Sequence, residues 1–369
     1  MSVKRLTHNL IIGFLMVGLL VSSITSGDAA TAGAIPAQTG WSAVGYGAGY
    51  MRFDHLTVID GLSENSVRTI MEDHLGFLWF GTQEGLNRYN GYDFTVYKTD
   101  PDNPAALSDA FITSIVEDPT GILWVGTYYG GLNRFDRETS RFRHFQPDSG
   151  DPRALPSERV NTLLMTTDGQ LWVGTRSGLS VLDGDLQGFT TYTHDPEHRS
   201  SLSDDEVLAL YEDEDGIIWV GTADGLNLFD PETGMFTRYL DRATTGVSHV
   251  NAITGDGGQG VWVGTENGLL HFGRPSRTYQ IYTHSPEDPN SLSSDIITSL
   301  YLDRSGGLWV GLEESGLNLI TDYQGDALQV EVYSHDDSDT NSLNQNEIWA
   351  ILEDSGGIMW FGTLGGGNQ

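Results

Sequence analysis

The chain has 369 residues, of which 38% are hydrophobic and 10% aromatic, so it can form a substantial core and is not disordered as a whole. Nineteen Lys and Arg residues against 51 Asp and Glu residues give a net charge of −32, which argues against nucleic-acid binding and against peripheral membrane binding. The absence of cysteine excludes disulfides, thiolate nucleophiles and cysteine-ligated metals, and 46 glycines indicate many turns.

The amino-terminal segment has the pattern of a secretory signal. Lys4 and Arg5 precede an apolar run of twelve residues, 10–21, and small and polar residues follow, with an A-x-A-like triplet at 30–32. The run is shorter than the roughly 20 residues of a membrane-spanning helix, although an uncleaved anchor extended by its flanks is the alternative. We therefore expect a signal peptide in residues 1–32, a Gly/Ala-rich linker in 33–52 and an extracytoplasmic domain in 53–369.

The remaining chain repeats one motif, a Trp followed by a hydrophobic residue and Gly. Successive tryptophans are separated by 45, 48, 47, 43, 47 and 51 residues. A period of roughly 40–50 residues with this signature is typical of propeller blades. The seven signature residues are Trp79, Trp124, Trp172, Trp219, Trp262, Trp309 and Trp360.

Each repeat contains four short apolar or aromatic runs separated by turns. In the first repeat, the run at 67–71 ends in an acidic-Gly turn, the Trp79 run and the 85–89 run follow, and Asn90-Gly91 turns into the aromatic run at 94–97. The sequence predicts an all-β fold, a seven-bladed β-propeller of four-stranded blades whose last blade is truncated. We expect Phe53–Val58 to close the ring by pairing as the outer strand of the seventh blade.

The repeated residues are interpreted as structural, because blade packing is needed seven times and an active site is not. Each Trp is expected to be buried between blades, with its N–H on a backbone carbonyl. The turn at 213–216 lacks the remaining ligands of a calcium loop, and the G-x-G-x-x-G match at 255–260 precedes a strand rather than a helix. We predict no metal, no cofactor and no catalytic residue. Four histidines recur at the outer edge of their blades, too far apart to share a metal: His144, His194, His284 and His335.

Variable residues are expected at one mouth of the central channel. In a blade whose strands alternate in direction, the loops after the second and fourth strands share one face, and the acidic-Gly turns lie on the other. On this variable face Tyr128 and Tyr129 could stack on a sugar ring, and Arg159 and Arg176 could hold an anionic group in a bidentate fork. These four residues are the predicted ligand-binding site.

The motif resembles the two-component regulator propeller repeat. The resemblance rests on FDHLTVIDGLS at 53–63, WFGT at 79–82 and GLNRY at 85–89, and it covers residues 53–369. It implies the extracytoplasmic sensor of a hybrid two-component histidine kinase, or sometimes of a diguanylate cyclase, that responds to a polysaccharide fragment and signals through a homodimer. The sixth repeat departs from the pattern at Leu312, and the fifth lacks the Ser-Leu-Ser entry and has Thr245-Gly246-Val247 instead.

The predicted function is therefore ligand sensing by part of a larger receptor or by a truncated gene product. The seventh repeat ends at Gly365–Gln369, and no kinase, receiver or cyclase signature is present. The partner is expected to be an oligosaccharide or another polar small molecule. The alternatives are a secreted propeller enzyme, such as a glycan lyase or hydrolase, and a purely structural scaffold.

Overall fold

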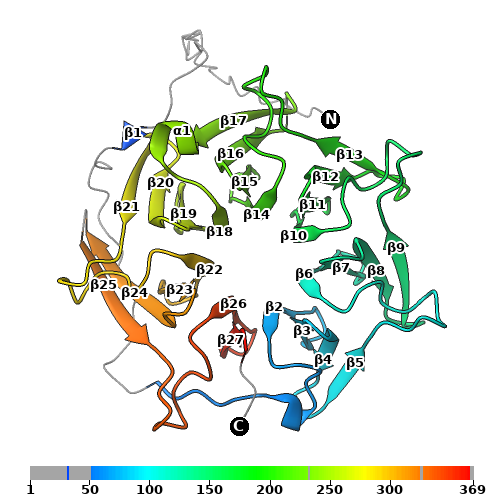
Figure 1. Ribbon diagram of the computed structural model, residues 1–369, viewed down its shortest axis with the longest axis horizontal. Helices are drawn as coiled ribbons and strands as arrows, with labels where there is room; N and C mark the ends of the chain where they lie inside the picture. The colour runs from blue at the N-terminus through cyan, green and yellow to red at the C-terminus, as the bar shows by residue number, and fades with distance from the viewer. Residues whose placement is uncertain (1–30, 33–50, 232, 325–326, 366–369) are drawn as a thin grey trace, which may run out of the picture.

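Seven small β-sheets stand in a ring around a central opening (Figure 1). The structure, a computed structural model, describes residues 31–32, 51–231, 233–324 and 327–365. The predicted signal peptide and linker lie outside these residues, apart from 51–52 and the short strand β1 (Thr31–Ala32), which runs parallel to the outer strand of the fifth blade.

Each sheet begins with a strand that lines the opening. These innermost strands are β2 (Val67–Glu72), β6 (Ile112–Glu117), β10 (Val160–Met165), β14 (Val207–Glu212), β18 (Val250–Gly255), β22 (Ile297–Leu302) and β26 (Ile348–Glu353). The second strands carry the Trp-x-Gly motif and are β3 (Leu78–Thr82), β7 (Leu123–Thr127), β11 (Leu171–Thr175), β15 (Ile218–Thr222), β19 (Gly260–Thr265), β23 (Leu308–Leu312) and β27 (Met359–Thr363).

The third and fourth strands complete six of the described sheets, and all pairs within a blade are antiparallel. The third strands are β4 (Gly85–Tyr89), β8 (Leu132–Asp136), β12 (Gly178–Leu182), β16 (Gly225–Asp230), β20 (Gly268–Gly273) and β24 (Leu317–Gln324). The fourth strands are β5 (Phe94–Tyr97), β9 (Arg141–Phe145), β13 (Phe189–Tyr192), β17 (Met235–Leu240), β21 (Thr278–Tyr282) and β25 (Ala327–Tyr333). A four-residue helix, α1 (Arg242–Thr245), precedes the fifth blade. The predicted seven-bladed all-β fold is confirmed.

The prediction that Phe53–Val58 pairs as a fourth strand of the seventh blade was wrong. Within the described residues this blade has two strands, β26 and β27, so no third strand offers an edge for pairing. The segment instead packs by its side chains: the Phe53 ring lies 5.8 Å from that of Phe361, and the Phe53 N–H donates to the Asn341 carbonyl. It ends in a 3-10 turn, η1 (Val58–Asp60).

The blades meet where the Trp-x-Gly motif leaves no room for a side chain. A Cβ on Gly81 would lie 2.5 Å from Thr69 Cγ2 within its blade and 2.6 Å from Ile112 Cγ2 in the next. Glycine at this position therefore lets neighbouring sheets approach closely.

Six of the seven tryptophans are buried between blades as predicted and Trp360 is half-buried, but their N–H groups do not bond to backbone carbonyls. Trp219 is fully buried against the fifth blade, and its Nε1 donates to Asp213 Oδ2 at 3.0 Å. The acceptor is the first Asp of the acidic-Gly turn, which lies six residues before the Trp in five repeats. Thr166 takes this place in the third repeat, and Trp172 Nε1 has no partner among the described residues. These aspartates thus have a structural role.

The ring is closed by the same contacts that join the other blades. At four of the described interfaces, a Glu at the end of an innermost strand accepts the backbone N–H of a turn residue in the preceding blade. Glu117 accepts from His74 at 2.8 Å between the first two blades, and Glu72 accepts from Ser355 at 2.6 Å between the last blade and the first. The rings of Phe80 and Trp360 meet edge to face across the same seam, 5.8 Å apart.

Candidate ligand-binding site

Two sets of loops share one face of the ring, as the strand alternation predicted. In five blades, the first residue after the second strand donates its N–H to the carbonyl of the residue that precedes the innermost strand. Tyr128 donates to Phe111 at 2.9 Å within the second blade, and Arg176 donates to Arg159 at 3.2 Å within the third. The variable loops are therefore fixed to the channel mouth rather than free at its rim.

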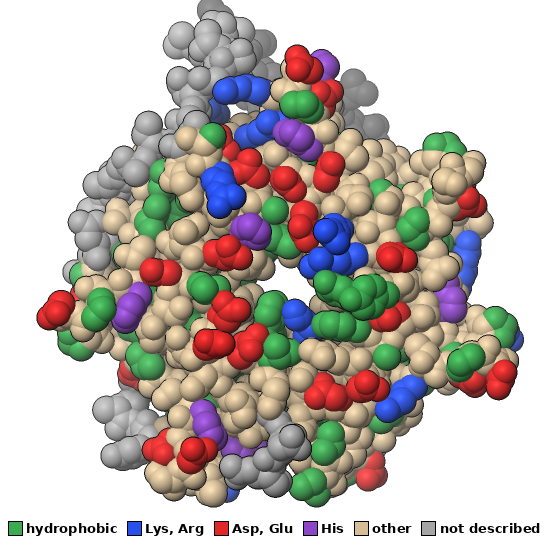
Figure 2. All heavy atoms as spheres, in the orientation of Figure 1, with side chains coloured by type: hydrophobic (Ala, Val, Ile, Leu, Met, Phe, Trp, Pro, Cys, Tyr) green, Lys and Arg blue, Asp and Glu red, His purple; other side chains and the backbone are tan. Residues whose placement is uncertain are grey.

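A cavity of about 630 Å³ occupies the channel beneath this face. Such a volume is within the usual range for small-molecule sites, about 300–1,000 Å³. All seven innermost strands contribute to its lining. In the space-filling view the molecule is hollowed at its centre, with large hydrophobic and basic side chains on one side of the opening and acidic side chains on the other (Figure 2).

Every innermost strand has a β-bulge at its second residue. In the first blade, Val67 pairs with Thr82 and Thr69 with Gly81, so Arg68 is an extra residue without a partner in β3. A bulge re-aims the side chain of its extra residue, and all seven extra residues line the cavity. We call them the bulge ring: Arg68, Thr113, Asn161, Leu208, Asn251, Thr298 and Trp349.

Four members of the bulge ring join neighbouring blades. Thr113 Oγ1 donates to the Val160 carbonyl at 2.7 Å, and Asn161 Nδ2 donates to the Val207 carbonyl at 2.9 Å. Asn251 and Thr298 donate to the equivalent carbonyls of the sixth and seventh blades. Thr and Asn at these positions therefore have a structural role.

Arg68 and Trp349 depart from this pattern and meet each other. The Arg68 guanidinium carbon lies 3.8 Å from the centre of the Trp349 ring and 5.3 Å from that of Phe111. The Phe111 ring stacks on Tyr128 at 5.0 Å, and the Arg159 guanidinium carbon lies 4.4 Å from the Tyr128 ring. These five residues form a continuous aromatic–arginine stack along one wall of the channel.

The structure brings two of the four predicted residues into the lining of this cavity and leaves the other two, Tyr129 and Arg176, outside it. Tyr128 and Arg159 line it. Tyr129 is 63% exposed, and its ring meets that of Tyr128 edge to face at 4.5 Å. Arg176 is exposed on the same face but is absent from the cavity lining. Arg159 already has partners, because its Nε donates to Asn161 at 3.0 Å and its Nη2 lies 3.5 Å from Glu206.

Sequence reasoning missed three members of the aromatic–arginine stack. Arg68, Phe111 and Trp349 were not selected, because each lies in or just before an apolar innermost strand rather than in a variable loop. The signal was nevertheless present. When the repeats are aligned on their tryptophans, the second residue of the innermost strand is Thr or Asn in four blades and Arg or Trp in two.

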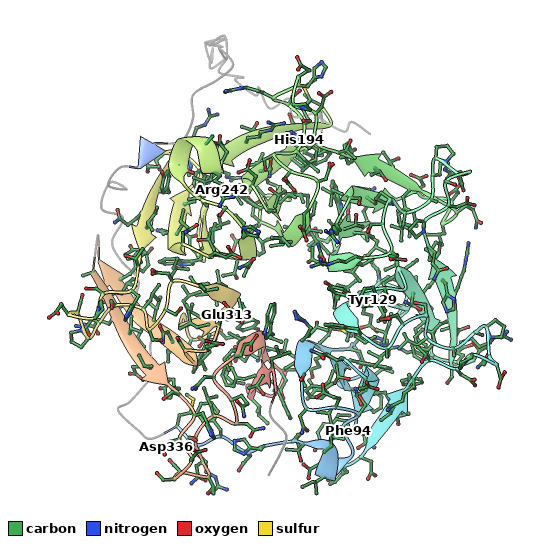
Figure 3. All side chains as sticks on the ribbon, viewed as in Figure 1. Phe94, Tyr129, His194, Arg242, Glu313 and Asp336 are labelled. Carbon is green, nitrogen blue, oxygen red and sulfur yellow. The ribbon has the colours of Figure 1, made fainter. Side chains whose placement is uncertain are left out.

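The opposite wall is acidic. Glu266 and Glu313 line the cavity from the fifth and sixth blades, and Figure 3 shows Glu313 across the opening from Tyr129. His249 Nδ1 lies 3.4 Å from a carboxylate oxygen of Glu266. His249 has a positive φ of 49°, which costs a non-glycine residue free energy and is typical of functional loops. The cavity thus has a cationic, aromatic side and an anionic side.

The outer histidines hold loops. His194 Nδ1 and His284 Nδ1 each bond to the backbone carbonyl of a leucine eight residues later, at 2.7 Å and 2.6 Å.

Among the described residues, no three His, Cys, Asp or Glu side chains are grouped so that they could hold a metal ion. In the same part of the chain, no helix is long and apolar enough to cross a bilayer.

Comparison with known families identifies the repeat. The model of the two-component regulator propeller matches residues 61–84, 106–129, 154–177, 201–224, 291–314 and 342–365. The chain contains six two-component regulator propeller repeats. Each match runs from the loop that precedes an innermost strand, through the bulge, to the loop after the second strand. The fifth repeat, which lacks the Ser-Leu-Ser opening, is not among the matched segments.

Solved extracellular domains of hybrid two-component systems are similar over most of the chain. The extracellular domain of the hybrid two-component system BT3049 from B. thetaiotaomicron is 26% identical, with a TM-score of 0.72 over 86% of this chain and 41% of that chain. The corresponding domain of BT4673 from the same organism is 25% identical, with a TM-score of 0.69 over 85% of this chain and 39% of that one. The chain therefore has the fold of these extracellular domains and spans about two fifths of their length.

Two other similarities are weaker, one in the length matched and one in sequence identity. Histidine kinase P4 of Formosa agariphila is 43% identical over 56 residues, which is 15% of this chain and 4% of that protein. Virginiamycin B lyase from Staphylococcus aureus is 14% identical, with a TM-score of 0.57 over 81% of this chain and 92% of the lyase. The second likeness is one of fold alone.

Proposed function

We propose that this regulator propeller is the ligand-sensing extracytoplasmic domain of a two-component-type receptor. Its ligand is an oligosaccharide or another polar solute, bound at the channel mouth. In the full-length receptor the domain is anchored to the cytoplasmic membrane, acts as a homodimer and controls a cytoplasmic transmitter such as a histidine kinase. The repeat family and the similar extracellular domains support the receptor assignment.

The observation that carries the binding proposal is the contrast between scaffold and mouth. The Trp, Gly and Asp residues of the blade motif repeat and form the interior, whereas the side chains at the channel mouth differ from one blade to the next. Aromatic faces at Tyr128 and Tyr129 offer area for a sugar ring, and Arg159 and Arg176 offer N–H donors. An asymmetric ligand requires such a mixture in an otherwise symmetric ring.

Calorimetry tests the proposal. The protein is titrated with a panel of neutral and acidic oligosaccharides, alongside the variants Tyr129→Ala and Arg176→Ala. We expect binding of a panel member to weaken by at least about tenfold in Tyr129→Ala, equivalent to about 1.4 kcal/mol. Tyr92→Ala is the matched control, because Tyr92 is 88% exposed in the β4–β5 turn, away from the mouth.

Each outcome discriminates. A ligand that binds equally well to both mouth variants would refute the location of the site, and a panel without any binder would refute glycan sensing. Degradation of a bound oligosaccharide by the purified protein would favour the alternative of a secreted propeller enzyme.

A further inference from the structure

Arg68 is a channel arginine without an anionic partner. No carboxylate oxygen of the described residues lies within 4.0 Å of its guanidinium, and no described acceptor takes a hydrogen bond from it. Of the two arginines that line the cavity, Arg159 lies 3.5 Å from a carboxylate oxygen of Glu206, whereas Arg68 has no such partner among the described residues. By contrast, Arg137, Arg153 and Arg274 each bridge two carboxylates.

The environment of Arg68 disfavours its charge. Burial in the channel wall is the main cause that lowers the pKa of its guanidinium, against an opposing contribution from Glu347. Glu347 accepts the indole N–H of Trp349 at 2.8 Å and thereby fixes the ring on which Arg68 rests. The nearest carboxylate thus positions the aromatic platform rather than pairing with the arginine.

Stacking leaves the edge of the guanidinium available. The N–H groups of arginine lie in the plane of the guanidinium. With Trp349 below one face at 3.8 Å and Phe111 at 5.3 Å, an acceptor must approach in the plane, where two parallel hydrogen bonds to a carboxylate form. The platform also holds the side chain in place, so little side-chain entropy remains to be lost on binding.

We propose that Arg68 binds the carboxylate of an acidic saccharide that enters the channel from the mouth. This inference rests on the proposed function, since it uses the same cavity. The saccharide ring lies against Tyr128, and its hydroxyl groups donate to Glu266 and Glu313 on the opposite wall. A uronic acid has both features, one carboxylate and several hydroxyl donors, and so matches the two walls of the cavity.

The test compares an acid with its ester. Trigalacturonate and its trimethyl ester share the same sugar rings, but the ester has no carboxylate. Both are titrated calorimetrically into the wild-type protein and into R68Q, R68K and R199Q. The last variant is a matched control, because Arg199 is exposed in the loop between β13 and β14 and is absent from the cavity lining.

We expect trigalacturonate to bind at least about tenfold more tightly than its ester, a preference worth about 1.4 kcal/mol. R68Q should abolish this preference, R199Q should keep it, and R68K should lose part of it because lysine lacks the planar fork. If R68Q is misfolded by circular dichroism, R68K decides, and an unchanged preference in R68K overturns the proposal.

Two results overturn the proposal while leaving the proposed function standing. One is equal affinity for acid and ester, and the other is binding of trigalacturonate to folded R68Q as to wild type. If neither trigalacturonate nor its ester binds while a neutral oligosaccharide of the panel does, the proposal for Arg68 is likewise overturned and the proposed function stands. If no acidic or neutral oligosaccharide binds, the inference and the proposed function fall together.

Discussion

Replacing Trp219 with Ala removes the side chain that joins the fourth blade to the fifth. Trp219 is completely buried, and its ring meets that of Phe272 in the next blade edge to face at 5.6 Å. A buried Trp covers roughly 200 Å² of surface, which corresponds to about 5 kcal/mol at about 25 cal/mol per Å². Ala retains part of this, and measured losses for such truncations are about 3–5 kcal/mol.

The hydrogen bond to Asp213 changes this value little. Its carboxylate keeps backbone donors from Asp215 and Ile217, each at 3.0 Å, and the guanidinium of Arg274 at 3.2 Å. It is therefore not left unsatisfied when the indole is removed. We expect Trp219→Ala to lower the free energy of unfolding by about 3–5 kcal/mol.

Urea titration followed by far-ultraviolet circular dichroism measures this loss without depending on tryptophan fluorescence. The slope of the free energy against urea concentration should stay the same, since the surface exposed on unfolding hardly changes. Tyr129→Ala, at an exposed site, should cost less than about 0.5 kcal/mol. A loss below about 1 kcal/mol for Trp219→Ala would show that the blade interface does not depend on this residue.

Two further predictions concern the seam and pH. Glu72→Ala removes the acceptor of the backbone N–H and the hydroxyl of Ser355 and should destabilise the protein by about 1–2 kcal/mol. Glu212→Ala, which removes the equivalent acceptor of Thr167 between the third and fourth blades, should cost as much. A negligible loss confined to Glu72 would show that other contacts hold the seam. A backbone carbonyl of its own loop, and then Asp337, raise the pKa of His335 above its ordinary 6.5. The resulting stabilisation is complete below about pH 6.5 and is lost as pH rises through the raised pKa. The difference in the free energy of unfolding between wild type and His335→Asn should therefore be larger at about pH 6 than at about pH 9. An unchanged difference would contradict the raised pKa of His335.

The repeat made the fold predictable from the sequence. Trp-x-Gly recurs because each blade needs a bulky wedge beside a position without a side chain, and both requirements depend only on neighbouring sheets. Closure was less accessible. Phe53–Val58 has the aromatic pattern of an outer strand, but a strand also needs an edge to pair with, and the described part of the last blade offers β27 rather than a third strand.

The site was predictable only in part, because alternation along a strand does not reveal a bulge. Tyr128 was found because it lies in a variable loop, and loops at a propeller mouth are exposed by topology. Arg68 lies within an innermost strand, and its access to the channel depends on one extra residue between two paired positions. Similarly, the indole N–H was wrongly expected to bond to a backbone carbonyl. The six-residue spacing between Asp213 and Trp219 does not show that their side chains meet, because that depends on the conformation of the turn between them.

The contact between Arg68 and Trp349 spans the junction between the first and the last blade. A propeller closes a linear chain into a ring, so at one interface the neighbouring blades, the first and the last, are not consecutive in sequence. A ligand held by both residues would bridge that place, and its binding free energy would then add to that of closure. Under the inference drawn for Arg68, ligand binding would thereby stabilise the closed ring.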